Sequence, residues 1–192
     1  EHRGNRSGRK ERIMKYSVVF SSRTGNTAQL AQAVLAALPP EDCIYSGSLD
    51  ELMQAGEASG WQEAPYLLAG FWTDKGSLDE KMTAFLQGIH HKKVFLFGTA
   101  GFGGSDAYFS RILENVSAQL PDDNTLLGTY MCQGKMPAAI KERYEAMLEK
   151  APDNERAAAF LANFSQALSH PDADDLEKLQ MRIRDIFTEQ KA

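Results

Sequence analysis

Residues 16–27 join a short apolar run to a polar loop. The run is Tyr16-Ser17-Val18-Val19-Phe20, and the loop is Ser21-Ser22-Arg23-Thr24-Gly25-Asn26-Thr27. A short, partly β-branched run of this kind is typical of a strand that is buried on both faces. The loop is followed by a helical stripe, which ends at Pro39-Pro40 and consists of Leu30, Ala31, Val34, Leu35 and Leu38. Residues 16–38 therefore predict a strand, a tight loop and a helix.

The same alternation continues along the chain. Further strands are expected at 66–72, 94–97 and 126–132, with a weaker candidate at Cys43-Ile44-Tyr45. Two helical stripes lie between them, one made of Met82, Phe85, Leu86 and Ile89, the other of Tyr108, Ile112, Leu113 and Val116. Repeated strand–helix–strand units connect right-handedly and place helices on both faces of a parallel sheet. The predicted class is α/β, with a doubly wound, five-stranded parallel sheet.

Three helical patterns follow the fifth strand, although the sheet needs only one closing helix. One begins at Pro137, the next contains Phe160 and Phe164, and the last follows Pro171. We expect the last to close the sheet and residues 134–169 to form an inserted helical hairpin. The domain organisation is then a disordered basic tail over 1–14 and a single domain over 15–192.

The charge is divided unevenly between the tail and the domain. Residues 1–15 hold six Lys or Arg and two Glu, a balance of +4, so the remainder carries −9 of the net charge of −5. An acidic domain argues against nucleic acid or an anionic membrane and favours a redox partner protein with a basic docking surface. No apolar run approaches the roughly 20 residues of a membrane-spanning helix. The two cysteines cannot form a disulfide framework, so we expect a soluble protein of the cytoplasm.

The loop after the first strand has the composition of a phosphate site. Gly25 tightens a turn that directs successive backbone N–H groups to one place, and the following helix adds its partial positive charge. Hydroxyls of Ser22, Thr24 and Thr27 are further donors. Ser, Thr and Asn also cap helices without any ligand, but capping does not require five such residues in seven positions. A Walker loop and the G-x-G-x-x-G fingerprint are both absent.

The segment Ser22-x-Thr24-Gly25-Asn26-Thr27 resembles the FMN-phosphate loop of flavodoxins, in the same strand–loop–helix context. This resemblance implies a strand order of 2-1-3-4-5 and a non-covalent FMN. It also implies that the phosphate is held by the loop residues Ser22, Arg23, Thr24, Gly25, Asn26 and Thr27. Gly-Phe-Trp, Gly-Thr and Cys-Gln-Gly at the ends of strands three to five resemble a branch of small flavodoxin-like proteins, some of which accompany bacterial bilirubin reductases.

Two further loops are expected to hold the flavin rings. After the third strand, Trp72 could stack on one ring face. In flavodoxins a peptide of this loop turns over when flavin N5 is protonated, and the resemblance implies that Gly76 makes both orientations accessible. The candidates in this loop are Trp72, Thr73, Asp74, Lys75 and Gly76. The glycine-rich loop after the fourth strand permits close approach of the backbone. Its candidates are Thr99, Ala100, Gly101, Phe102 and Gly103, with Tyr108 beyond. Phe102 and Tyr108 remain alternatives for the second ring face, and Trp72 could instead pack in the core.

No residue pattern indicates a catalytic side chain or a metal site. His90 and His91 would point about 100° apart on a helix and would chelate one ion poorly. Cys132 is expected to be buried and inert. The favoured function is an FMN-binding electron carrier that passes electrons to a partner reductase. The alternatives are an FMN-dependent reductase of a quinone or tetrapyrrole-like acceptor, and a cofactor-free interaction module.

Overall fold

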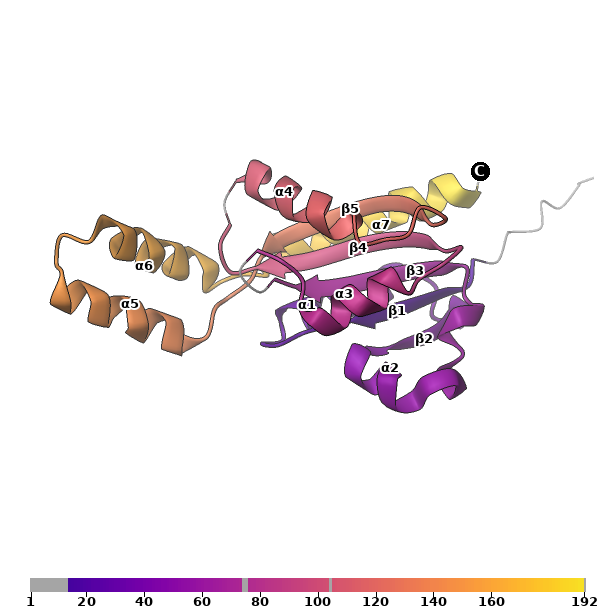
Figure 1. The fold of residues 1–192 in the computed structure, drawn as a ribbon. Coiled ribbons are helices and arrows are strands. Elements are labelled where there is room, and N and C mark those ends of the chain that lie inside the picture. Colours follow the sequence, from indigo (N-terminus) through magenta and orange to yellow (C-terminus); the bar gives the residue numbers. More distant parts are fainter. Residues whose placement is uncertain (1–13, 74–75, 104, 192) are drawn as a thin grey trace, which may run out of the picture.

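A twisted parallel sheet forms the centre of the computed structural model, which describes residues 14–73, 76–103 and 105–191 (Figure 1). Its strands are β1 (Tyr16–Phe20), β2 (Cys43–Ser48), β3 (Tyr66–Trp72), β4 (Lys93–Ala100) and β5 (Thr125–Gln133). They lie in the order β2-β1-β3-β4-β5, and every neighbouring pair is parallel. The predicted α/β class and the order 2-1-3-4-5 are confirmed. The strands at 43–45, 94–97 and 126–132 are longer than predicted.

Seven α-helices occur in the described parts of the chain. They are α1 (Asn26–Ala37), α2 (Leu49–Ala55), α3 (Glu80–Gln87), α4 (Asp106–Ser117), α5 (Ala138–Lys150), α6 (Glu155–Ala167) and α7 (Ala173–Lys191). Short 3₁₀ turns cover Pro40–Asp42, Gly56–Ser59 and Trp61–Glu63. Helix α2 was not predicted. It has only two buried apolar residues, Leu49 and Leu52, but a capping box of Ser48 and Glu51 fixes its start.

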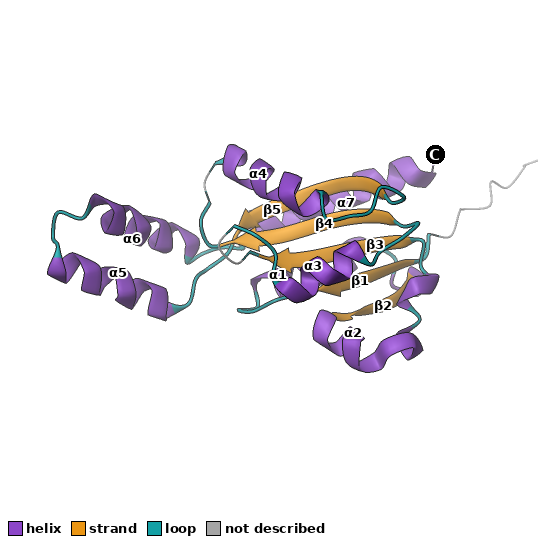
Figure 2. Ribbon diagram, in the orientation of Figure 1, coloured by secondary structure: helices purple, strands orange, loops and turns teal. Residues whose placement is uncertain are grey.

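The sheet divides the core into two layers (Figure 2). Helices α1 and α7 cover one face, where Val34 and Ile183 pack with Val18 of β1. Helices α2, α3 and α4 cover the other face with a second apolar cluster, which includes Leu86 and Ile112. The sequence pattern predicted helices on both faces because the strands read as continuous apolar runs, and the structure confirms this arrangement.

Met14 belongs to the folded domain, although the sequence boundary placed it in the tail. Its side chain is only 3% exposed and packs in the layer formed by α1 and α7. Burial of a methionine side chain removes apolar surface from water and stabilises the start of β1 by roughly 1.5–3 kcal/mol. The rest of the predicted tail, residues 1–13, lies outside the described part.

Helices α5 and α6 form the expected inserted hairpin. They pack against each other beyond the carboxyl end of β5 and extend away from the sheet, seen at the left of Figures 1 and 2. The two ends of the insertion meet at its root, where the Lys135 N–H donates to the His170 carbonyl at 2.8 Å. No residue of α5 is buried, so the buried residues of the two hairpin helices, Ala157, Phe164 and Ala167, all belong to α6.

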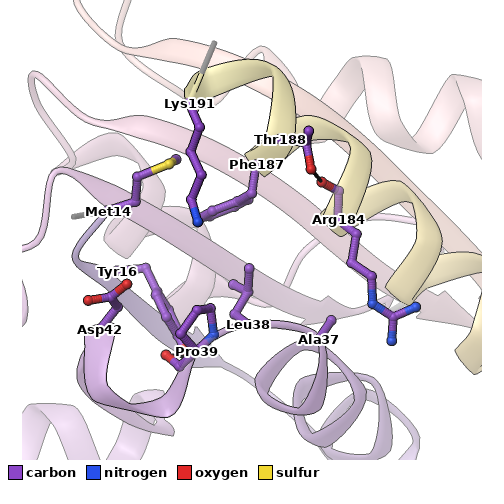
Figure 3. Close-up of a pocket in the computed structure, with 10 residues that line it drawn as sticks. All are labelled: Met14, Tyr16, Ala37, Leu38, Pro39, Asp42, Arg184, Phe187, Thr188 and Lys191. Atoms are coloured by element: carbon purple, nitrogen blue, oxygen red, sulfur yellow. Dashed lines mark hydrogen bonds between the residues drawn. The ribbon is translucent and has the colours of Figure 1, made fainter. Parts of the chain in front are cut away.

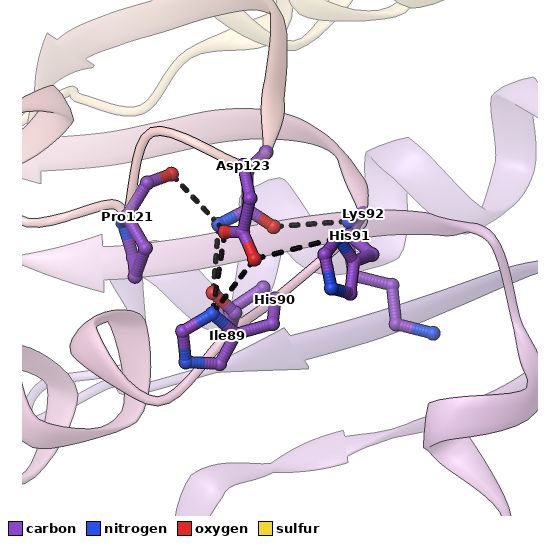
Figure 4. Close-up of polar contacts among 7 residues, drawn as sticks. Ile89, His90, His91, Lys92, Pro121 and Asp123 are labelled. Carbon is purple, nitrogen blue, oxygen red and sulfur yellow. Dashed lines mark hydrogen bonds and ion pairs between the residues drawn. The ribbon is translucent and has the colours of Figure 1, made fainter.

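His90 and His91 lie in a turn and not on a helix, because α3 already ends at Gln87. Both Nδ1 atoms face the Asp123 carboxylate, at 2.9 Å from His90 and 3.4 Å from His91 (Figure 4). The neighbouring Asn124 side chain donates to the Ile89 carbonyl and accepts from the Lys92 N–H. These contacts tie together the turns that precede β4 and β5.

Within the described ranges, no helix has both the length and the apolar character that crossing a membrane would require.

Candidate functional site

A cavity of about 180 Å³ lies at the carboxyl ends of the central strands. It is bounded by the loops that follow β1, β3 and β4 and by the start of the hairpin. The residues that line it are Arg23, Thr24, Asn26, Trp72, Thr73, Thr99, Gly101, Gly134, Lys135, Met136, Pro137 and Ile140. This is the edge at which open parallel sheets bind ligands. Three loops that were predicted separately thus meet at one site.

The loop after β1 leaves the first two N–H groups of α1 uncapped within the described part of the chain. Gly25 is the residue before α1, adopts φ +90°, and offers no side-chain cap. A left-handed backbone of this kind favours glycine. The first free N–H groups of α1, those of Asn26 and Thr27, have no acceptor among the described residues, whereas the Ala28 N–H donates to Ser22 Oγ at 3.2 Å. An uncapped helix start of this type is a ready site for an anion.

The hydroxyls of this loop differ in what they can still donate. Thr27 Oγ1 is fully buried, 3.1 Å from the Phe71 carbonyl and 3.0 Å from Thr99 Oγ1. Its proton therefore serves the protein, and the contact holds α1 against the ends of β3 and β4. Ser22 Oγ and Thr24 Oγ1 instead accept hydrogen bonds, from the Ala28 N–H and from Asn26 Nδ2. Because each hydroxyl also has one proton to donate, Ser22 and Thr24 are the available donors.

Asn26 connects the loop to the root of the hairpin. Its Nδ2 donates to the Lys135 carbonyl at 2.9 Å and to Thr24 Oγ1 at 3.2 Å. The side chain is 6% exposed, and its Oδ1 is buried without a partner among the described residues. A buried acceptor without a donor costs about 1–3 kcal/mol. Since Asn26 lines the cavity, this atom indicates a ligand that brings a hydrogen-bond donor.

Trp72 forms part of the cavity wall and is held at its indole nitrogen. Nε1 donates to Ser21 Oγ at 3.1 Å, and Ser21 Oγ donates to Asp79 Oδ2 at 2.8 Å. Asp79 is in turn fixed as the N-cap of α3. The Arg23 guanidinium lies 5.4 Å from the centre of the Trp72 rings. This chain of contacts orients a flat aromatic surface beside the phosphate-type loop.

The loop after β4 is attached to the hairpin. The Gly101 carbonyl accepts from Gln133 Nε2 at 3.1 Å and from Asn163 Nδ2 at 3.0 Å. Gln133 Nε2 also donates to Asn163 Oδ1, so an amide of β5 and an amide of α6 hold the same peptide. Thr73 extends the wall, because its N–H and its hydroxyl both donate to the Thr99 carbonyl.

The structure brings seven of the predicted site residues to the cavity wall: Arg23, Thr24, Asn26, Trp72, Thr73, Thr99 and Gly101. The other candidates within the described residues do not line it: Ser22, Gly25, Thr27, Gly76, Ala100, Phe102, Gly103 and Tyr108. Gly76 adopts φ +81°, as expected of a turn that requires glycine. Asp74 and Lys75 lie outside the described residues.

The two aromatic alternatives for a second ring face point elsewhere. Phe102 packs edge-on against Phe160 of α6, with ring centres 5.1 Å apart. Tyr108 packs with the apolar layer on the α3 and α4 side, near Phe109. The sequence reasoning missed the hairpin's own part of the wall, namely Met136, Pro137 and Ile140. Their only signal was the cluster Cys132-Gln133-Gly134-Lys135 at the same sheet edge.

Two titratable features near this edge have structural explanations. Burial raises the pKa of the Cys132 thiol well above its ordinary value, with a further contribution from Asp175 and Asp172. His170, Asp172 and Asp175 lie close together. However, Asp172 and Asp175 accept each other's backbone N–H at the start of α7, and Asp175 accepts from His170 Nδ1 at 2.6 Å. This cluster is a helix cap.

Comparison with known proteins gives consistent matches. The family model described as "Flavodoxin domain" matches residues 17–184. The chain is 39% identical to the flavodoxin-like domain-containing protein BilS of Clostridium symbiosum, over 87% of this chain and 93% of that protein. It is 34% identical to BilS of Clostridioides difficile, over 91% and 97%. Among solved structures, a flavodoxin, WrbA-like protein from Agrobacterium tumefaciens shares the fold, with a TM-score of 0.55, 14% identity, and coverage of 93% and 99%.

Proposed function

Because the chain belongs to the flavodoxin domain family, we propose that it binds FMN non-covalently and transfers electrons to a partner protein. The observation that carries this proposal is the uncapped start of α1, where the Asn26 and Thr27 N–H groups have no acceptor in the described chain. A phosphate accepts hydrogen bonds and carries negative charge, so it suits both the free donors and the helix dipole.

The other groups of the site also suit FMN. The unpaired Asn26 Oδ1 calls for a donor, and the ribityl chain of FMN carries hydroxyls. Arg23 and Lys135 line the cavity and supply positive charge beside the phosphate position. Trp72 offers a flat surface next to them, on which an aromatic ring system can stack. Thr24, Asn26 and Trp72 therefore line one cavity, and the donors of Ser22 and Thr27 belong to the same loop and helix start.

Each part of the protein has a separate task under this proposal. Bound FMN supplies the redox chemistry, because it accepts and releases electrons one or two at a time. The loop of Ser22, Thr24 and the α1 N–H groups binds the phosphate, and the Thr27 hydroxyl holds α1 against the end of β3 through its bond to the Phe71 carbonyl. Trp72 excludes water from one ring face, while its bond to Ser21 keeps the indole in place.

The proposed partner is a protein with a basic docking surface. Residues 16–192 carry a net charge of −9, since residues 1–15 contribute +4 to a total of −5. An acidic protein is attracted to a basic surface over distances of about 10 Å at 0.1 M salt. Electron transfer between them should therefore slow as the salt concentration rises.

Stepwise anaerobic reduction tests the proposal directly. The purified chain is loaded with FMN, freed of excess cofactor and titrated with dithionite while its absorption spectrum is followed. We expect the spectral changes to resolve into two separate one-electron steps, as suits a carrier that exchanges single electrons. One concerted two-electron step would contradict the carrier role and favour a reductase. A protein that retains no flavin would contradict the FMN assignment.

A further inference from the structure

A second cavity, of about 460 Å³, lies between the hairpin and the loop after β4. It is lined by Phe102, Arg143, Tyr144, Met147, Arg156 and Phe160. Cavities that bind small molecules typically enclose about 300–1,000 Å³ and are mostly apolar, with a few polar groups. Nothing in the proposed FMN site uses this hairpin cavity.

The apolar wall of the hairpin cavity is aromatic. The Phe160 ring lies 4.7 Å from the Tyr144 ring and 5.1 Å from the Phe102 ring, measured between centres. All three side chains remain partly exposed, although they come from α6, α5 and the loop after β4. Aromatic rings from three elements thus form a partly exposed aromatic cluster, with the Phe102 and Tyr144 rings inclined to the Phe160 ring by 66° and 42°.

Two guanidinium groups border the same cavity. Arg143 and Arg156 are exposed, and neither lies within ion-pair distance of a carboxylate in the described ranges. Arg156 also lies over the Phe160 ring, 5.4 Å from its centre. By contrast, Lys141, which lies on α5 with Arg143, is paired with Glu145. A guanidinium binds carboxylates through two parallel hydrogen bonds and stacks on flat rings.

The hairpin cavity adjoins the candidate FMN site. Ile140 lines the FMN cavity and Tyr144 lines the hairpin cavity, and they lie one turn apart on the same side of α5. In the loop after β4, Gly101 lines the FMN cavity and the next residue, Phe102, lines the hairpin cavity. A molecule in the hairpin cavity would therefore sit beside the redox cofactor.

We propose that the hairpin cavity binds a flat, conjugated small molecule that carries an anionic group such as a carboxylate. The aromatic wall recognises the conjugated part, and the two unpaired arginines recognise the anion. The volume of the cavity, about 460 Å³, lies in the range of sites that bind small molecules. This binding goes beyond the proposed FMN site and does not require that FMN be bound.

Two related dyes test the proposal on the full chain. Anilinonaphthalene sulfonate is flat and anionic, and phenylnaphthylamine has the same ring frame without the charge. Both gain fluorescence in apolar sites. We expect the double variant Arg143→Gln, Arg156→Gln to weaken binding of the anionic dye about tenfold or more and binding of the neutral dye less than about threefold. Phe160→Ala should weaken both.

A matched control comes from another apolar cavity in the described part of the chain. This cavity, of about 230 Å³, lies at the opposite end of the sheet and contains Met14, Phe187, Arg184 and Lys191 (Figure 3). Arg184→Gln should leave both dyes unaffected. The proposal would be overturned if Arg184→Gln reduced dye binding, if the arginine pair had no effect, or if the wild type bound neither dye.

Two further results separate this inference from the FMN proposal. Added FMN should leave the anionic dye bound, and displacement would place the dye in the FMN cavity and overturn the inference. If FMN does not bind at all, the arginine variants still decide the outcome. A dimer in sedimentation velocity that Phe160→Ala dissociates would mean that a second copy fills the cavity, against the proposal.

Discussion

Asn26 links the phosphate-type loop to the root of the hairpin through two side-chain hydrogen bonds. Its Nδ2 donates a hydrogen bond to the Lys135 carbonyl, and its buried Oδ1 has no hydrogen-bond donor among the described residues. From the sequence alone, Asn26 was predicted only as one of six residues of a phosphate-binding loop. Its contact with Lys135 spans 109 residues, so no local pattern could have predicted it.

Asn26→Asp should impair cofactor binding strongly. The substitution removes the donor to Lys135 and places a buried carboxylate beside the phosphate position. We expect FMN affinity to fall about 100-fold, or roughly 2.7 kcal/mol, in a titration that follows flavin fluorescence. Asn115→Asp, an exposed change on α4, is the matched control and should leave FMN affinity unchanged. Equal affinity in both variants would count against the loop assignment.

Cys132 should be unreactive in the native protein. It is 3% exposed, and burial raises the pKa of its thiol, so very little thiolate forms near neutral pH. We expect Cys132 to react with iodoacetamide at pH 8 only as fast as the protein unfolds, and denaturant should accelerate the reaction. Mass spectrometry of the labelled peptide is the measurement. Rapid labelling in the absence of denaturant would show that the thiol is accessible and would contradict its burial in the native protein.

At the scale of elements, the hairpin of α5 and α6 is an insertion whose first and last residues lie next to each other. The Lys135 N–H and the His170 carbonyl are hydrogen-bonded, so a short Gly-Ser link can replace residues 136–169. We expect the shortened protein to unfold cooperatively and to bind FMN with no more than about a tenfold loss, since only Met136, Pro137 and Ile140 leave the cavity wall. Thermal unfolding and FMN titration test this. Loss of cooperative unfolding would show that the hairpin is part of the core.

The elements differ in how well the sequence predicts them. Buried strands such as β3 read as continuous apolar runs and helices such as α4 show a clear apolar stripe, so the parallel sheet and its helices could be predicted from the residues, whereas the strand order came only from the resemblance to flavodoxins. Helix α2 was not predicted from the sequence, because it buries only Leu49 and Leu52 and its start depends on a capping box. The orientation of the Phe102 side chain was not predicted either, because its contact with Phe160 depends on how the hairpin folds back.

For the whole molecule, the polarity of the sheet determines where chemistry can occur. The carboxyl ends of the strands gather the free N–H groups of α1, Trp72 and the hairpin cavity. The opposite end holds structural contacts such as those of Asp123 with His90 and His91. FMN and riboflavin differ only in the phosphate, so a comparison of the two isolates the contribution of the α1 helix start.

Side-by-side calorimetric titrations of the flavin-free protein with FMN and with riboflavin therefore test the central claim. We predict that FMN binds at least about 100-fold more tightly, because two or more charge-assisted hydrogen bonds to the phosphate are lost with riboflavin. Equal affinity for the two flavins, or no binding of FMN, would contradict it.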